Sequence, residues 1–184
     1  MHLERVSQRF NRTLVMAAFN LVNGGVSIGI IATVALLTRE AFIFPSLGAT
    51  AFLLFFAPLS AAAAPRNVFL GHAIGAIVGW ICLAMMGLLD APSALVAGVD
   101  WPRVMVAALS LGLTGALMVL FNCAHPPAGA TALIVSLGLM PDLEQIPILL
   151  VAVLLLLVQA FAMNRLAGIA YPLWSAAQSA AGPR

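Results

Sequence analysis

The sequence predicts an all-α, polytopic membrane protein that contains an internal repeat. Eight Lys or Arg and six Asp or Glu occur in 184 residues, and the mean hydropathy is +1.10. About 25% of the residues of a soluble domain are charged, so this composition indicates that most of the chain lies in a bilayer. The pattern P-x-x-G-A-T-A occurs at Pro45–Ala51 and again at Pro126–Ala132. Each copy lies beside long uncharged runs, which is typical of a membrane domain with two related halves.

The first repeat, residues 14–89, is predicted to form a span, a broken short helix and a second span. A polar and basic segment, residues 1–13, precedes it. Leu14–Leu37 is long enough to cross, since a span needs about 20 apolar residues. Leu47–Ala64 is apolar but opens with the first motif, and Val68–Leu89 follows as a span. That last segment carries small residues at a spacing suited to close helix contact: Gly71, Gly75 and Gly79.

The second repeat, residues 104–164, follows the polar connection Asp90–Arg103 and has the same order. Val104–Phe121 is a span, and a break at Asn122–Pro127 follows it. Ala128–Met140 is apolar, but its thirteen residues are too few for a bilayer core of about 30 Å. Ile146–Met163 is the last span, so the membrane domain covers residues 14–164. The tail, residues 165–184, is expected to lie at the interface or in the cytoplasm.

Two topologies fit these segments. Either the broken helices cross, which gives six segments and inverts the second repeat, or they are re-entrant, which leaves four spans. Both place the N-terminus and six of the eight arginines in the cytoplasm. We favour six segments, because that arrangement also puts every acidic residue except Glu4 outside. We expect the protein in a bacterial inner membrane. The inside arginines of the six-segment arrangement are Arg5, Arg9, Arg12, Arg66, Arg165 and Arg184.

The repeated motif has the composition of a narrow helix N-terminus. Proline fits the first helical turn, glycine and alanine add little bulk, and threonine supplies a hydroxyl. Such an end carries free N–H donors and partial positive charge, so it suits a small anion. In an inverted repeat two such ends approach each other near the midplane. The alternative is that the motif only permits tight packing. The predicted anion-binding residues are Gly48, Ala49, Thr50, His125, Pro126, Pro127, Gly129, Ala130 and Thr131.

Several polar residues within or beside spans are predicted to serve in a pore or in coupling. His125 is a candidate anion donor, proton-coupling group or gate, and a histidine bonded to a backbone carbonyl is the alternative. His72 lies on the glycine-rich span, where packing and function are both open. Amides that join helices are the alternative for the four asparagines. These candidates are Asn20, Asn23, Asn67, His72 and Asn122.

Other classes of function find little support in the sequence. No acid lies inside a span, which disfavours cation transport and favours a neutral or anionic substrate. No catalytic motif or metal-ligand cluster is recognised, so we expect no enzyme activity, no metal and no cofactor. The arginines are scattered at segment ends, which argues against nucleic-acid binding. Cys82 and Cys123 are expected to be small buried residues.

The segment Asn122–Leu133, N-C-A-H-P-P-A-G-A-T-A-L, resembles the HPP family of integral membrane proteins. The resemblance extends to Pro45–Ala51, to A-P-R-N-V-F-L-G-H at Ala64–His72 and to Y-P-L-W at Tyr171–Trp174. It implies four transmembrane segments, which matches the re-entrant arrangement rather than six crossings. It also implies nitrite transport, which is associated with chloroplast and cyanobacterial members. The family motif maps onto His125, Pro126, Pro127, Gly129, Ala130 and Thr131.

These observations lead to one leading hypothesis and two alternatives. The leading one is transport of a small inorganic anion, with nitrite as the leading candidate, between two opposed helix N-termini. A passive channel or uniporter for a small solute is the alternative within transport. A membrane scaffold, whose repeat serves packing alone, is the alternative outside it. A homodimer in the bilayer is compatible with the glycine-rich surfaces.

Overall fold

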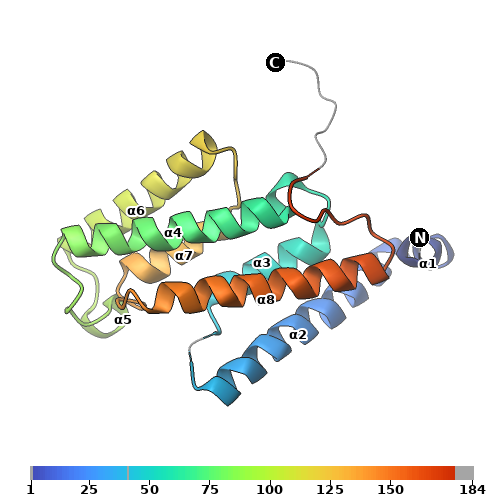
Figure 1. Cartoon of the computed structure of the whole chain (residues 1–184), viewed down its shortest axis with the longest axis horizontal. Coiled ribbons are helices and arrows are strands. Elements are labelled where there is room, and N and C mark those ends of the chain that lie inside the picture. The colour runs from blue at the N-terminus through green and yellow to red at the C-terminus, as the bar shows by residue number, and fades with distance from the viewer. Residues whose placement is uncertain (1, 41, 177–184) are drawn as a thin grey trace.

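The computed structural model describes residues 2–40 and 42–176, over which all regular secondary structure is helical and no strand occurs (Figure 1). Four long apolar helices have the length and composition of membrane spans. The predicted all-α membrane fold is thus confirmed, while residues 177–184 of the predicted tail lie outside the described part. The elements in chain order are α1 His2–Arg9, α2 Arg12–Thr38, α3 Pro45–Phe56, η1 Ala61–Ala63, α4 Pro65–Met85, α5 Ala94–Ala97, α6 Trp101–Leu120, α7 Ala128–Ser136 and α8 Gln145–Leu166.

The long helices begin at residues that suit a helix start. The Asn11 side chain accepts hydrogen bonds from the N–H groups of Thr13 and Leu14 at the start of α2. Helix α4 begins at Pro65, whereas the sequence predicted a span from Val68, because proline at the first position loses no hydrogen bond. Asp100 caps α6 by accepting from the N–H of Arg103.

The two motif helices are shorter than the apolar segments predicted around them. Helix α3 ends at Phe56 instead of extending to residue 64, because Pro58 cannot continue a helix. Helix α7 ends at Ser136 instead of Met140, and Gly138 turns the chain with a φ of 75°. Twelve helical residues cover about 18 Å, so neither short helix crosses a bilayer core of about 30 Å by itself.

The segment that contains the second motif helix, α7, lies along α4. Arg66, in the first turn of α4, donates to the backbone carbonyls of Phe121 and Asn122. Trp80, near the other end of α4, donates to the carbonyl of Pro141. These two levels of α4 are about 21 Å apart, from fourteen residues at about 1.5 Å each. The segment 122–141, with α7 inside it, therefore runs along most of the length of α4.

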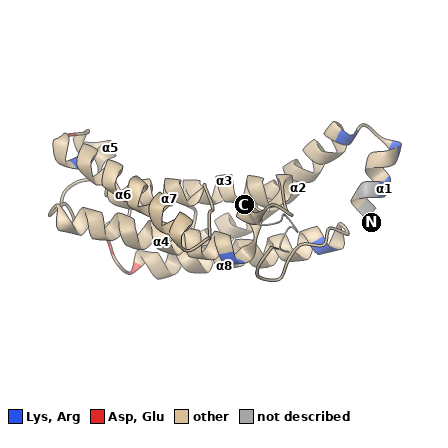
Figure 2. Ribbon diagram, turned by 90° about the horizontal axis from the view of Figure 1, so that it is seen from above, with Lys and Arg blue, Asp and Glu red and all other residues tan. Residues whose placement is uncertain are grey.

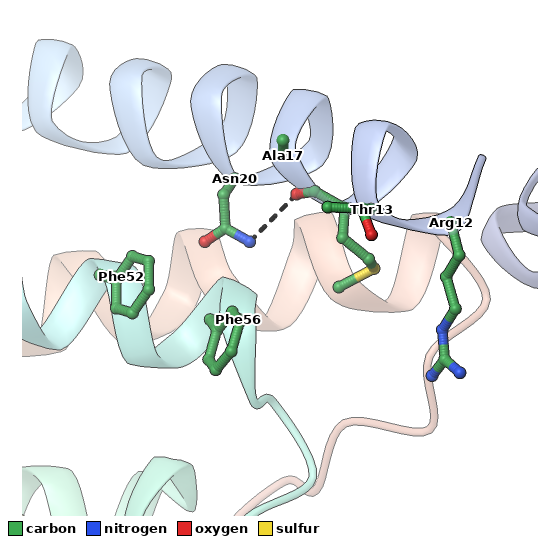
Figure 3. A pocket seen from close by; sticks show the side chains of 7 residues that line it. Arg12, Thr13, Ala17, Asn20, Phe52 and Phe56 are labelled. Atoms are coloured by element: carbon green, nitrogen blue, oxygen red, sulfur yellow. Dashed lines mark hydrogen bonds between the residues drawn. The ribbon is translucent and has the colours of Figure 1, made fainter.

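The first motif helix, α3, lies in the same way along α2. Phe52 and Phe56 of α3 line a groove with the first turns of α2, and Figure 3 shows Phe56 closer than Phe52 to Arg12, so α3 runs antiparallel to α2. The end of α3 lies beside the end of α8, where the Asn164 amide donates to the carbonyl of Leu54. Each half therefore has the order long helix, irregular segment, short helix, long helix. This is consistent with the predicted repeat, and the chain makes six passes along the bundle, of which four are long helices.

The passes separate the charged residues between two ends of the bundle (Figure 2). Figure 2 shows the acidic residues gathered on the side of α5 and most of the basic residues on the side of α1. We call the end that holds α1 and the start of α4 the basic end. Its described arginines are Arg5, Arg9, Arg12, Arg66 and Arg165. The opposite, acidic end holds Arg39, Arg103, Glu40, Asp90, Asp100, Asp142 and Glu144. This is the distribution that the six-segment arrangement predicted.

Cysteine labelling tests the crossing of the first motif segment. In a background without Cys82 and Cys123, we expect Arg39→Cys and Leu59→Cys to be labelled from opposite sides of the membrane. Leu59 is 62% exposed in the connection between α3 and α4, so its replacement leaves the contacts of Arg66 intact. Labelling of both cysteines by an impermeant maleimide from the same side would show that α3 is re-entrant. Permeabilised membranes, in which both cysteines react, serve as the control.

The described residues after α8, 167–176, pack against the start of α4 at the basic end, and the predicted interfacial or cytoplasmic position of the tail stays a prediction. Tyr171 is fully buried, and its hydroxyl donates to the carbonyl of Ala63 at 2.7 Å. The backbone N–H of Arg66 donates to the carbonyl of Trp174. The Y-P-L-W segment therefore closes the basic end around the start of α4. Leu173 and Trp174 remain exposed and suit the membrane interface.

Candidate functional site

The two copies of the motif meet at His72. Thr50 and Thr131 occupy the same position in P-x-x-G-A-T-A, and each hydroxyl contacts a different nitrogen of the His72 ring. The distance is 2.9 Å from Thr50 Oγ1 to Nε2 and 2.7 Å from Thr131 Oγ1 to Nδ1. His72 lies on α4, between the two motif helices α3 and α7. The repeated threonines thus belong to one site, which separate helices assemble.

His125 extends this contact into a continuous polar network. Its Nε2 lies 3.1 Å from Thr50 Oγ1, and its Nδ1 lies 2.7 Å from the carbonyl oxygen of Ala62. The two imidazole centroids are 5.0 Å apart. We call Thr50, His72, His125 and Thr131 the His–Thr network. All four side chains have no solvent exposure, so the network is closed on both sides in this conformation.

The glycine-rich face of α4 is what allows the second motif to reach His72. A Cβ added at Gly71 would lie 2.9 Å from His125 Cβ, and one at Gly75 would lie 2.6 Å from the carbonyl oxygen of Ala128. A Cβ at Gly79 would lie 2.8 Å from the carbonyl oxygen of Ala132. The backbones of α4 and α7 are therefore in contact, as the glycine spacing predicted.

The helix N-termini lie side by side rather than end to end. Thr50, in the second turn of α3, contacts His125, which precedes the first residue of α7 by three positions. The structure brings Thr50, His125 and Thr131 together, but it leaves the other predicted anion-binding residues outside the network. Gly48, with no atom within 4 Å of an added Cβ, is exposed, as are Ala49, Pro126 and Ala130, while Pro127 is half-buried and Gly129 is buried near Leu111.

Of the predicted pore or coupling residues, only His72 joins the network. The amides of Asn20 and Asn23 donate to the carbonyls of Met16 and Phe19 in their own helix, so neither joins another helix in the described part. The amide of Asn67 donates to the carbonyl of Ala61. Asn122 supplies its carbonyl to Arg66 and adopts a left-handed backbone with a φ of 48°. These asparagines shape helix ends and surfaces.

The sequence analysis did not identify three polar groups that the structure places in or near the buried interior. The carbonyl of Ala62 fixes one end of the network. Ser46 is fully buried one turn before Thr50, and its hydroxyl has no hydrogen-bond partner within the described residues. Arg103 is buried at the acidic end, where its guanidinium donates to the carbonyls of Leu137 and Pro92. The spacing of Ser46 and Thr50 places them on one helix face, which was visible in the sequence.

A separate groove opens between α2 and α3, toward the basic end (Figure 3). Its volume is about 520 Å³, and Figure 3 shows Asn20 above Phe56, Phe52 farther from Arg12, and Arg12 at one end. Its lining is mostly apolar and does not include the His–Thr network. No group of three or more His, Cys, Asp or Glu side chains that could hold a metal ion occurs in residues 2–40 and 42–176.

Long apolar helices, charges confined to helix ends and a buried polar junction between two halves define a polytopic integral membrane protein. Comparison with known families is specific: residues 9–172 match the HPP transmembrane region. The chain belongs to the HPP family, and the predicted resemblance is confirmed.

Two curated relatives are transmembrane proteins of Dictyostelium discoideum. One is 32% identical over 138 residues, which cover 70% of this chain and 44% of the relative. The other is 38% identical over 93 residues, which cover 50% of this chain and 27% of the relative. The chain thus spans less than half the length of each. No solved structure matches the chain.

Proposed function

We propose that this protein transports a small monovalent anion, with nitrite as the leading candidate, through the junction where its two halves meet. The observation that carries the proposal is the convergence of both motif threonines on His72. Two copies of one motif have no packing reason to direct their hydroxyls at one buried imidazole. A site at the interface of two repeats is the arrangement used by many secondary transporters.

The chemistry of the junction favours an anion. Hydroxyls and imidazoles can donate hydrogen bonds, and beside Thr50 the buried hydroxyl of Ser46 has no hydrogen-bond partner among the described residues. The carboxylates lie toward the ends of the bundle, so they do not repel an anion at the junction. The closed network favours a carrier that opens alternately over a permanently open channel. We further propose that the basic end faces the cytoplasm, following the positive-inside rule.

Anion flux into proteoliposomes tests the proposal, with His125→Asn as the central variant. Asparagine keeps a donor for the carbonyl of Ala62 but removes the contact with Thr50, so it limits the damage to folding. We expect nitrite flux to fall by about tenfold or more, equivalent to about 1.4 kcal/mol. Thr33→Val is the matched control, because the exposed Thr33 hydroxyl contacts only the carbonyl of Gly29.

One result would contradict transport, and a second would contradict the role of His125 in it. The first is wild-type protein, folded in liposomes, that moves none of nitrite, nitrate, formate and chloride above protein-free vesicles, which would favour the scaffold. The second is a His125→Asn variant with unchanged flux per folded molecule and lowered thermal stability, which would give His125 a structural role. Linear, non-saturating conduction would favour the channel over the carrier.

A further inference from the structure

The His–Thr network has one hydrogen-bond direction that is fixed by a carbonyl. The carbonyl of Ala62 can only accept, so His125 must carry a proton on Nδ1. In the neutral ring Nε2 is then bare and accepts from Thr50. Thr50 has a single hydroxyl proton, for which the carbonyl of Ser46 at 2.9 Å is a second acceptor. When Thr50 donates this proton to His125, it accepts from Nε2 of His72. Nδ1 of His72 in turn accepts from Thr131, so every member of the neutral network is satisfied.

The same heavy-atom positions also satisfy the network with one proton more. If the proton is added to His72, its Nδ1 donates to Thr131 and its Nε2 donates to Thr50, while Thr50 still donates to His125. If it is added to His125, the Nε2 of that ring donates to Thr50. Thr50 then turns its own proton to the carbonyl of Ser46 at 2.9 Å, or to His72 Nε2 once His72 carries its proton on Nδ1 instead of Nε2. Neither charged form requires a heavy atom to move.

We propose that Thr50 relays a single proton between His72 and His125, and that the protein carries this proton together with its anion. The N–H bond at Nε2 of His72 breaks as that proton bonds to Thr50 Oγ1. The original O–H bond of Thr50 breaks as its proton bonds to Nε2 of His125. The positive charge moves from one imidazole to the other, and no further reactant is needed. This inference rests on the proposed anion transport and names a proton as the second substrate.

The surroundings limit the network to one proton. Rings whose centroids are 5.0 Å apart repel each other when both are charged. Helices α3 and α7 contain no titratable residue. Among the described residues, three other such groups lie around the junction. They are the Cys123 thiol, buried beside Ala128, the guanidinium of Arg66, which donates to the carbonyls of Phe121 and Asn122, and the phenol of Tyr171, which donates to the carbonyl of Ala63. A transported anion is therefore the natural counter-charge.

Stoichiometry in proteoliposomes tests the relay. Nitrite is added outside vesicles that contain a pH-sensitive dye, and valinomycin with potassium sets the membrane potential. We expect one proton to enter with each nitrite, so lumenal acidification matches uptake and uptake does not respond to the potential. Protein-free vesicles correct for diffusion of nitrous acid. Thr50→Val removes the hydroxyl at nearly constant shape, and we expect it to reduce coupled uptake by about tenfold, whereas Thr50→Ser retains it.

The outcomes separate the relay from the transport proposal. Uptake that carries net negative charge and leaves the lumenal pH unchanged would overturn the relay but leave anion transport standing. Absence of any uptake by folded wild-type protein would overturn transport.

Nitrogen NMR decides the relay independently of flux. The sequence contains three histidines, so ¹⁵N-histidine labelling reports His72 and His125 with His2 as a reference. We expect acidification in the presence of nitrite to add one proton that the two rings share, and Thr50→Val to confine it to one ring. Two separate titrations that are identical in wild type and Thr50→Val would overturn the relay.

Discussion

Replacing Gly75 with alanine is expected to cause the largest loss of stability of any single methyl addition in α4. The added Cβ would lie 2.6 Å from the carbonyl oxygen of Ala128 and 3.3 Å from the backbone nitrogen of Ala132. Both atoms belong to the backbone of α7, which cannot rotate away as a side chain can. Overpacking costs about 1–3 kcal/mol. Because the obstacle is backbone, we expect the cost of Gly75→Ala to lie at or beyond the top of that range.

Two opposing effects decide whether Gly75→Ala lowers or raises the stability of the protein. Alanine in a helix interior is favoured over glycine by about 0.8–1.0 kcal/mol, so the steric cost must exceed this gain. Gly112→Ala on α6 is the matched control, because no atom lies within 4 Å of its added Cβ. We therefore expect the melting temperature in detergent to fall for Gly75→Ala and to stay or rise for Gly112→Ala. Equal melting temperatures for the two variants would refute the contact between α4 and α7.

Thr50→Val and Thr131→Val are expected to destabilise the protein by unequal and non-additive amounts. Valine keeps the shape but leaves a buried imidazole nitrogen without a partner, at a cost of about 1–3 kcal/mol for each group left unsatisfied. Thr50 contacts both His72 and His125, whereas Thr131 contacts His72 alone. Thr50→Val should therefore be the more damaging of the two.

The double variant tests whether the two motif copies form one site. Because both threonines share His72, we expect a coupling energy of about 0.5–3 kcal/mol from unfolding titrations of the four proteins in mixed detergent. The same cycle read from nitrite affinity would extend the result from folding to binding. Strict additivity in both measurements would mean that the copies act separately, and the two-fold site would be wrong. Thr33→Val, combined with each single variant, is the control, because we expect its effect on stability to add to theirs without coupling.

The sequence predicted those features that depend on local composition. Hydropathy alone located the four long helices, because a span must be uncharged over about 20 residues wherever it lies in the bundle. The spacing of Gly71, Gly75 and Gly79 predicted a close helix contact, because a four-residue interval places small residues on one face. The repeated motif pointed to Thr50, Thr131 and His125 as members of a site.

Helix ends were predicted less well, because they depend on single residues. The sequence predicted a span only from Val68, yet Pro65 opens α4, and Pro58 stops α3 earlier than hydropathy indicated. Hydropathy averages over many residues, whereas a proline acts at one position and in opposite ways at the two ends of a helix.

The tertiary structure alone decided how the site is assembled. Thr50 and His72 are 22 residues apart, and His72 and Thr131 are 59 apart, so no periodicity connects them. The carbonyl of Ala62, which fixes the proton on His125, carries no sequence signature, because every residue has a carbonyl. Which helix faces meet depends on the rotation of each helix about its axis, and only packing against the other helices sets that rotation. Packing likewise turned Gly48 outward while bringing Thr50, two residues later, onto both histidines.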